Sequence, residues 1–460
     1  MEYKYMRLLK DTGIFAIGNL GSKLILFLLV PLYTNYMTAD EYGTSDLVFT
    51  IAQLVIPFTS LVIFDAVQRF GLSKYERPEN VLLGGILVCV AGSVISFAIF
   101  PLLNLYDAIA NWSWYLILYV ILNMFGSVEM NYLKARDKNK LFAAFSILQT
   151  LALALCNIAF LCWQDMGIAG YLLSTCIASL VPVVFPLLFG GVFHDLLRAE
   201  LDFDLLKRMI LFSTPLILNN LSWWGIHSAD KVIVETVLGA SALGIFTVAS
   251  KIPSLINVMV NIFSQAWGIS SVKEIESTND SDFYSNVLAV YQALAFGASI
   301  AIVAIVKPFM AIYVGVDFGD SWRYVPLLLV GAAFSAIASY FGSIYGALLK
   351  SINSMITTVL SAAVNVIIGI VLVPIIGLWG AVVSVYASYA VLAIHRLYDV
   401  RRFLKIDYGG WRLYANALVA TVQAVFVSLD VQIATASIIA IILFALINKP
   451  LIKGLIGRGL

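Results

Sequence analysis

The sequence predicts an all-α integral membrane protein with about fourteen transmembrane helices. Of its 460 residues 61% are hydrophobic and 12% are charged, and the mean hydropathy is +0.94. A soluble chain of this composition could not cover its core with polar surface. Apolar runs of about 20 residues, the length that crosses a bilayer, also recur along the chain. The net charge of +1 points to no nucleic-acid partner.

Fourteen apolar runs bounded by charged or turn residues define the predicted spans. Their approximate limits are 12–36, 45–68, 81–103, 113–132, 141–163, 167–193, 208–229, 243–270, 286–309, 324–349, 353–375, 377–397, 411–429 and 431–448. The first run is too long for the core of a signal peptide, so we expect it to be a span. No connection exceeds about 20 residues, so we expect no soluble catalytic domain and no catalytic residues. The four cysteines lack the close pairing of a metal site, and no metal ligands are predicted.

Most of the basic residues are expected to lie on one side of the membrane. If the N-terminus is cytoplasmic, roughly 23 of the 28 Lys and Arg fall on the cytoplasmic side and about three on the other. This asymmetry predicts a multi-pass membrane protein with both termini in the cytoplasm. The two remaining cations, Lys23 and Lys251, lie inside spans.

Three short similarities recur in order at a separation of about 200 residues. They pair Leu8–Lys10 with Leu205–Lys207, Ala39–Gly43 with Ala240–Gly244, and Tyr132–Ala135 with Leu348–Ser351. We therefore expect two six-helix bundles, 1–193 and 194–408, followed by a hairpin of two extra transmembrane helices, 409–460. Because six is even, both copies start on the same side, which makes the repeat a parallel one. Paired bundles around a central cavity are typical of alternating-access transporters, although channels and inert scaffolds also contain repeats.

Several motifs resemble those of a known family. They are Leu205–Lys207, Phe212–Leu216, Ala229–Lys231, Gly244–Phe246 and Ala249–Ile252 in the middle of the chain, and Gly18-Asn19, Pro31–Tyr33, Glu41–Gly43 and Ala66–Phe70 near the start. Together they are similar to the bacterial polysaccharide flippases of the multidrug/oligosaccharidyl-lipid/polysaccharide exporter superfamily, over nearly the whole chain. The resemblance implies translocation of oligosaccharide repeat units on undecaprenyl pyrophosphate, from the cytoplasmic to the periplasmic leaflet, for O-antigen, capsule or exopolysaccharide. It also implies that the protein lies in the bacterial cytoplasmic (inner) membrane and acts together with a polysaccharide polymerase and a chain-length regulator.

An anionic headgroup of this kind needs fixed cations in the cavity. Lys23 lies about twelve residues past Asp11, roughly 18 Å along a helix and near the bilayer midplane, where a lysine costs about 2.5–3.5 kcal/mol. It either binds cargo phosphate or pairs with an acidic neighbour. Lys251 matches the lysine of the family's Ala-x-Lys-Ile pattern and is expected to face Lys23, unless it snorkels to the surface. Arg69 is either an inward-facing gate or the partner of Asp65.

Acidic residues in the spans have two interpretations each. Asp65 and Glu129 are either coupling groups for H⁺ or Na⁺ or counter-charges to nearby cations. Asp230 is either solvated or a counter-charge to Lys231 or Lys251. Three cations at the ends of the equivalent fourth and tenth spans either set the topology or meet the cargo, namely Lys134, Arg136 and Lys350. No other cofactor is predicted.

Polar and aromatic residues gather in the outer part of the seventh span. They are Asn219, Asn220, Trp223 and Trp224. Trp at this depth either anchors the helix at the membrane interface or stacks on a sugar ring. We therefore hold these four as candidate sugar contacts.

Two other functions compete. A cation-coupled multidrug exporter of the same superfamily would need an acidic cavity, whereas the mid-depth charges here are lysines. A membrane glycosyltransferase or polymerase acting on lipid-linked sugars would need a long outer loop with catalytic side chains, and the predicted outer loops are short. The sequence therefore favours a flippase for an anionic lipid-linked oligosaccharide, bound within the phospholipid bilayer.

Overall fold

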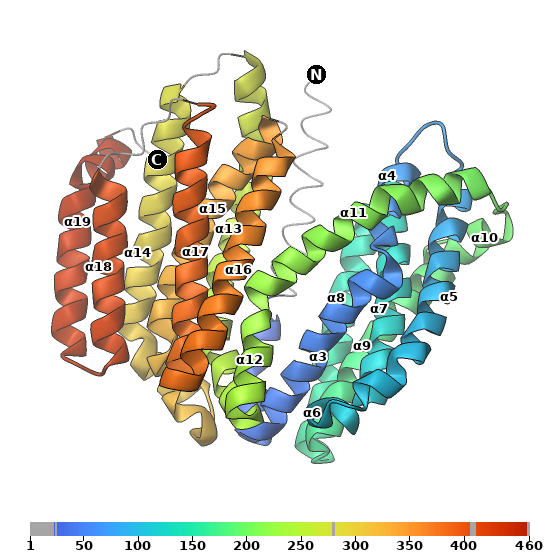
Figure 1. Ribbon diagram of the computed structural model, residues 1–460, viewed down its shortest axis with the longest axis horizontal. Coiled ribbons are helices and arrows are strands. Elements are labelled where there is room, and N and C mark those ends of the chain that lie inside the picture. Colours follow the sequence, from blue (N-terminus) through green and yellow to red (C-terminus); the bar gives the residue numbers. More distant parts are fainter. Residues whose placement is uncertain (1–22, 24, 278–280, 349, 405–410, 458–460) are drawn as a thin grey trace. The chain divides into compact units, whose positions relative to one another are not determined.

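The computed structural model describes residues 23, 25–277, 281–348, 350–404 and 411–457, and all regular structure in these residues is helical (Figure 1). The chain divides into two compact units, residues 1–224 and 225–460. The predicted all-α membrane fold is therefore confirmed. The bundle boundaries predicted at residues 193/194 and 408/409 stay a prediction.

Unit 1 is built around one central helix. Its helices are α2 (Val30–Tyr36), α3 (Ala39–Ser60), α4 (Ile63–Gly71), α5 (Pro78–Leu103), α6 (Asp107–Ala110), α7 (Ser113–Ala135), α8 (Asn139–Asn157) with its π-helical extension (Ile158–Trp163), α9 (Gly167–Phe189), α10 (Val192–Leu197) and the start of α11 (Phe203–His227). α7 packs against α3, α4, α5, α8 and α9. The site described below lies on α7.

The predicted span 45–68 is broken rather than continuous. α3 begins with a capping box between Thr38 and Glu41, and it ends at Leu61 and Val62, which both have left-handed backbone with φ of 50° and 54°. α4 leaves at 55° to α3. Ser60 Oγ accepts a hydrogen bond from the Val62 amide at 3.1 Å, which satisfies a donor that the break would otherwise leave buried without a partner.

Unit 2 has its own central helix. After the end of α11 it contains α12 (Ala229–Leu238), α13 (Ala240–Ser277), α14 (Ser281–Tyr313), a 3₁₀ segment (Val316–Arg323), α15 (Val325–Ala347), α16 (Ser351–Ile376), α17 (Leu378–Val400), α18 (Trp411–Ser428) and α19 (Ile433–Gly457). α15 packs against α13, α14, α17 and α18. Of the residues in its most apolar stretch, 78% are buried within the protein.

The last two helices form the predicted hairpin. α18 and α19, drawn in red in Figure 1, pack against each other and against α14. Three buried amides join them: Asn416 Nδ2 donates to Gln292 Oε1 at 3.3 Å, and Asn448 Nδ2 donates to Asn416 Oδ1 at 2.9 Å. Where water is excluded such amides must find each other, so these bonds fix the hairpin on unit 2.

Each predicted span coincides with a helical segment. Among the described residues ten helices are long and apolar enough to cross a membrane, or eleven if the bent pair α3–α4 is one span. The remaining three predicted spans coincide with the short helix Ile25–Tyr36, α11 and α18. The first span lies partly outside the described residues. A multi-pass membrane protein is confirmed, and the number fourteen stays a prediction.

The two units end their central helices with the same contact. In unit 1 the Tyr132 hydroxyl donates to Asp195 Oδ2 at 2.8 Å, and in unit 2 the Tyr345 hydroxyl donates to Asp399 Oδ2 at 2.8 Å. In both cases a tyrosine at the end of the fourth predicted helix of the bundle binds an aspartate that follows or ends the sixth. This shared contact supports the predicted duplication.

Candidate functional site

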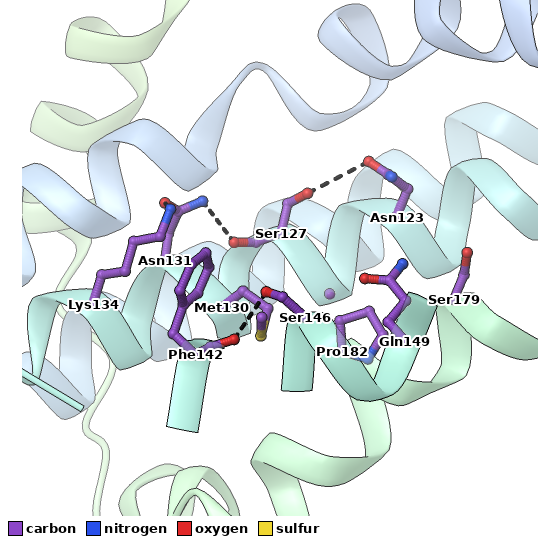
Figure 2. Close-up of a pocket in the computed structure, with 11 residues that line it drawn as sticks. Asn123, Ser127, Met130, Asn131, Lys134, Phe142, Ser146, Gln149, Ser179 and Pro182 are labelled. Carbon is purple, nitrogen blue, oxygen red and sulfur yellow. Dashed lines mark hydrogen bonds between the residues drawn. The ribbon is translucent and has the colours of Figure 1, made fainter. Parts of the chain in front are cut away.

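A polar groove of about 250 Å³ opens between α7, α8 and α9 in unit 1 (Figure 2). Its walls are formed by side chains of these three helices. They are Asn123, Gly126, Ser127, Met130, Asn131 and Lys134 of α7, Phe142, Ser146 and Gln149 of α8, and Ser179 and Pro182 of α9. Amides and hydroxyls dominate this lining, although the three helices are apolar membrane spans.

One face of α7 supplies most of the polar groups. Asn123, Ser127, Asn131 and Lys134 are spaced by three or four residues, so they share one side of the helix. Ser127 Oγ donates to Asn123 Oδ1 at 3.4 Å, and Asn131 Nδ2 donates to the Ser127 carbonyl at 2.9 Å. Eleven residues separate Asn123 from Lys134, which is roughly 16 Å of helix. The groove therefore extends from the C-terminal end of α7 to near the middle of the span.

α8 and α9 complete the groove. Ser146 Oγ donates to the Phe142 carbonyl at 2.8 Å, and Ser179 Oγ donates to the Thr175 carbonyl at 2.8 Å. Figure 2 shows Gln149 beside Ser179 and Pro182. The amide of Gln149 is half-buried and makes no hydrogen bond to any described residue. Because an amide group within a membrane span needs a hydrogen-bond partner, the Gln149 side chain is able to bind a ligand or water in the groove.

Lys134 is the one charged residue in the groove lining. Its Nζ donates to Asn131 Oδ1 at 3.3 Å and lies 4.3 Å from the centroid of the Phe142 ring. It forms no ion pair with any residue in the described part of the chain. The charge of Asp65 on α4 acts on it from further away. Asn131 and Phe142 thus hold the ammonium group in place.

The three predicted cavity cations lie outside this groove. Lys23 and Arg69 are exposed side chains of unit 1, and Lys251 is a half-buried residue of α13 in unit 2. Arg69 makes no ion pair with Asp65 within the described residues, so the interpretation of those two as an ion pair is wrong. The expectation that Lys23 faces Lys251 stays a prediction.

The predicted acidic residues differ in burial. Glu129 on α7 is only 1% exposed, and its Oε2 has no hydrogen-bond partner among the described residues. Asp230 on α12 is 2% exposed, so the interpretation of it as a solvated residue is wrong, and its charge acts on the buried Tyr389. Asp65 is half-buried on α4. None of the three lines the groove.

The candidate sugar contacts are spread along α11. Asn219 and Trp223 are exposed, whereas Asn220 and Trp224 are half-buried. Asn220 Nδ2 donates to the Leu216 carbonyl at 3.0 Å, and Trp224 Nε1 donates to the Thr50 carbonyl at 2.9 Å. Trp224 therefore holds α11 to α3, which is a packing role. Sugar binding by these four residues stays a prediction.

Sequence reasoning missed the environment of Arg396, a residue at the end of the predicted span 377–397 that it counted among the cytoplasmic cations. The residue lies within α17, is 2% exposed and extends toward α15 and α16. Its Nη1 donates to the Ala338 carbonyl at 2.8 Å, its Nη2 to Thr358 Oγ1 at 2.9 Å and its Nε to Thr357 Oγ1 at 3.1 Å. The guanidinium is thus solvated by neutral oxygens of its own unit. The signal was the cluster of hydroxyls at the start of α16.

Solved structures with the same fold are membrane transporters. The chain is similar to the lipid II flippase MurJ in its inward closed conformation, with a TM-score of 0.72 and 12% identity over 95% of this chain and 99% of that one. It is also similar to a multidrug resistance MATE family transporter of the MOP superfamily in an inward-facing conformation. That match has a TM-score of 0.63 and 17% identity, covering 82% of this chain and 98% of the other. The fold is therefore that of the exporter superfamily predicted from the sequence.

Residues 8–268 match the family described as polysaccharide biosynthesis protein. Because this match covers more than half of the chain, the protein belongs to that family. A relative from Haemophilus influenzae, protein 1 of the Lsg locus, is 21% identical over 266 residues. That alignment covers 57% of this chain and 65% of the relative, so the chain spans less than two thirds of the relative it matches. The sequence-based predictions of a polysaccharide family and of the exporter superfamily fold are therefore confirmed.

Proposed function

We propose that this protein moves lipid-linked oligosaccharide repeat units across the bacterial inner membrane, from the cytoplasmic to the periplasmic leaflet, by alternating access. The carrier lipid is undecaprenyl pyrophosphate, and the product is O-antigen, capsule or exopolysaccharide. The observation that carries this proposal is the groove between α7, α8 and α9, a row of amides and hydroxyls with one cation inside a span. Membership of the polysaccharide biosynthesis family supports it.

Physical chemistry favours a polar cargo over an apolar one. Amides, hydroxyls and a lysine in a transmembrane helix are unfavourable where they face lipid, so they mark a path for polar groups. Sugar hydroxyls both donate and accept hydrogen bonds, as Asn, Gln and Ser side chains do. A cationic drug would need a carboxylate in the groove, and the charged group there is Lys134. This composition supports a saccharide cargo rather than drug export.

The remaining roles follow from this function. Lys23, Lys251 and Arg69 attract the pyrophosphate, while Asp65, Glu129 or Asp230 couples transport to H⁺ or Na⁺. Both termini lie in the cytoplasm, and a polymerase and a chain-length regulator receive the cargo on the periplasmic side. The protein carries out no covalent chemistry in this scheme.

A leaflet-exposure assay tests the proposal. Liposomes containing the purified full-length protein and a fluorescent undecaprenyl-pyrophosphate oligosaccharide are treated with a membrane-impermeant enzyme that cleaves the sugar. Protein-dependent cleavage of the initially protected half is expected. If the protected half stays intact in proteoliposomes as it does in empty liposomes, the protein is not a flippase for this cargo. In cells, Lys23→Glu is expected to abolish surface polysaccharide while the protein remains inserted.

A further inference from the structure

We propose that the groove between α7, α8 and α9 binds a single pyranose ring that carries an anionic group, with Lys134 as the residue that recognises the anion. This inference rests on the proposed function and specifies which part of the cargo unit 1 recognises. The anionic group is either the carboxylate of an acidic sugar or the phosphate on the first sugar of the cargo. Both present a sugar ring with a negative charge beside it.

The size of the groove limits the ligand to one ring. Its volume is about 250 Å³, whereas pockets for drug-sized ligands start at roughly 300 Å³. A whole repeat unit of several sugars would not fit. One ring would contact the three helices at once, while the rest of the cargo stays outside.

The distribution of polar groups matches a ring with one charged substituent. The deep part is lined by neutral groups, namely Asn123, Ser127, Gln149 and Ser179, which suit ring hydroxyls. The end formed by Asn131 and Lys134 offers a cation with no ion pair among the described residues. The half-buried amide of Gln149, with no partner in the described structure, supplies both a donor and an acceptor for a hydroxyl.

The position of Lys134 is fixed by its surroundings. The Asn131 amide oxygen accepts a hydrogen bond from its Nζ, and the Phe142 ring lies under the ammonium. Such a cation loses little side-chain entropy when an anion binds, which favours binding over a mobile surface lysine. Lys140, six residues later at the start of α8, is exposed and lies outside the groove. It is a matched control with the same charge.

Equilibrium binding of small sugars to the full-length protein in detergent tests the inference. The probes are glucuronate, glucose 1-phosphate, glucose and inorganic phosphate. Glucuronate and glucose 1-phosphate are expected to compete for one site, and glucose and inorganic phosphate to bind at least tenfold more weakly. Lys134→Gln is expected to weaken both anionic sugars about tenfold, which is about 1.4 kcal/mol. Lys140→Gln is expected to leave their affinities unchanged.

A second variant protects the test against misfolding. Gln149→Leu keeps Lys134 and is expected to weaken glucuronate, glucose 1-phosphate and glucose alike, because it removes a ring contact. The inference is overturned if glucose binds as tightly as glucuronate, if inorganic phosphate binds as tightly as glucose 1-phosphate, or if both variants bind like the wild type. None of these binding results decides the proposed function, which the leaflet-exposure assay tests separately. Conversely, a wild type that binds the anionic sugars but moves no lipid-linked oligosaccharide refutes the proposed function alone.

Discussion

In unit 1 the space between α7, α8 and α9 is an open groove of about 250 Å³, whereas in unit 2 Arg396 of α17 reaches α15 and α16 and bonds to both. These are the fourth to sixth predicted spans of each bundle. Unit 2 provides several acceptors for Arg396 from its own chain, whereas in unit 1 Lys134 has the acceptor Asn131 Oδ1 and Gln149 makes no hydrogen bond to a described residue. The difference indicates that side chains of unit 2 close the space between its three helices. The corresponding space in unit 1 is open, and its polar groups are able to bind a ligand.

The largest expected effect comes from removing the buried cation of unit 2. Arg396→Met leaves the hydroxyls of Thr357 and Thr358 and the Ala338 carbonyl without their donors, so we expect a loss of about 3 kcal/mol of stability. Thermal unfolding in detergent measures it. The control is Arg402→Met, which removes an arginine that is 77% exposed and pairs with Asp399 at 3.4 Å. It should cost less than about 1 kcal/mol. Equal stability of both variants would refute a structural role for Arg396.

The two tyrosine–aspartate contacts should differ in strength. Tyr132→Phe removes the bond to Asp195, and about 2 kcal/mol of stability should be lost because the acceptor is charged. Tyr345→Phe should cost about 1 kcal/mol, since Asp399 keeps its 2.9 Å bond from Asn353. Unfolding of both variants in the same detergent compares them. A larger loss in Tyr345→Phe would contradict this order.

Filling the groove should affect transport more than stability. Ser146→Phe places a ring in the groove, and we expect the rate of leaflet exposure to fall about tenfold, equivalent to about 1.4 kcal/mol. Ala144→Phe is the control, because Ala144 is an exposed residue of the same helix outside the groove. If both variants transport at the wild-type rate, the groove is not on the path of the cargo.

The smallest expected effect on stability comes from Glu129, an acidic residue of α7 that has no acidic counterpart on α15. Glu129→Gln removes a buried carboxyl whose Oε2 has no described partner, so the variant should be as stable as the wild type or more stable by about 1 kcal/mol. Glu79→Gln, which loses a contact of 3.9 Å with Arg136, should be slightly destabilised. A clear destabilisation by Glu129→Gln would mean that the carboxyl has a structural partner.

Much of the fold follows from local sequence, because an apolar run of about 20 residues has few alternatives to a membrane helix. Within the described residues, the predicted spans therefore coincide with helical segments. The break at Leu61 and Val62 was not predictable, since the apolar pattern continues through it. The proline nearest to the break, Pro57, does not mark it, because α3 continues through that residue. Tertiary packing sets the position of such a break.

Only part of the groove could be predicted from the sequence. The spacing of Asn123, Ser127 and Asn131 marks a polar face on α7, but the positions of Ser146, Gln149 and Ser179 depend on how α8 and α9 pack against it. Lys134 was one of several cations at helix ends until the structure placed it among these residues. Arg396 was counted with the cytoplasmic cations because it lies at the very end of the predicted span 377–397, whereas α17 continues to Val400.

The most direct test compares the lysines that end the two central helices. Proteoliposomes with wild-type protein, Lys134→Gln or Lys350→Gln are assayed for leaflet exposure of an undecaprenyl-pyrophosphate oligosaccharide that contains an acidic sugar. Lys350 is exposed, lies 5.2 Å from the Phe403 ring and is not part of the unit 1 groove. We predict that Lys134→Gln slows transport about tenfold while Lys350→Gln transports like the wild type. Equal rates in both variants would contradict the assignment of the unit 1 groove to the cargo.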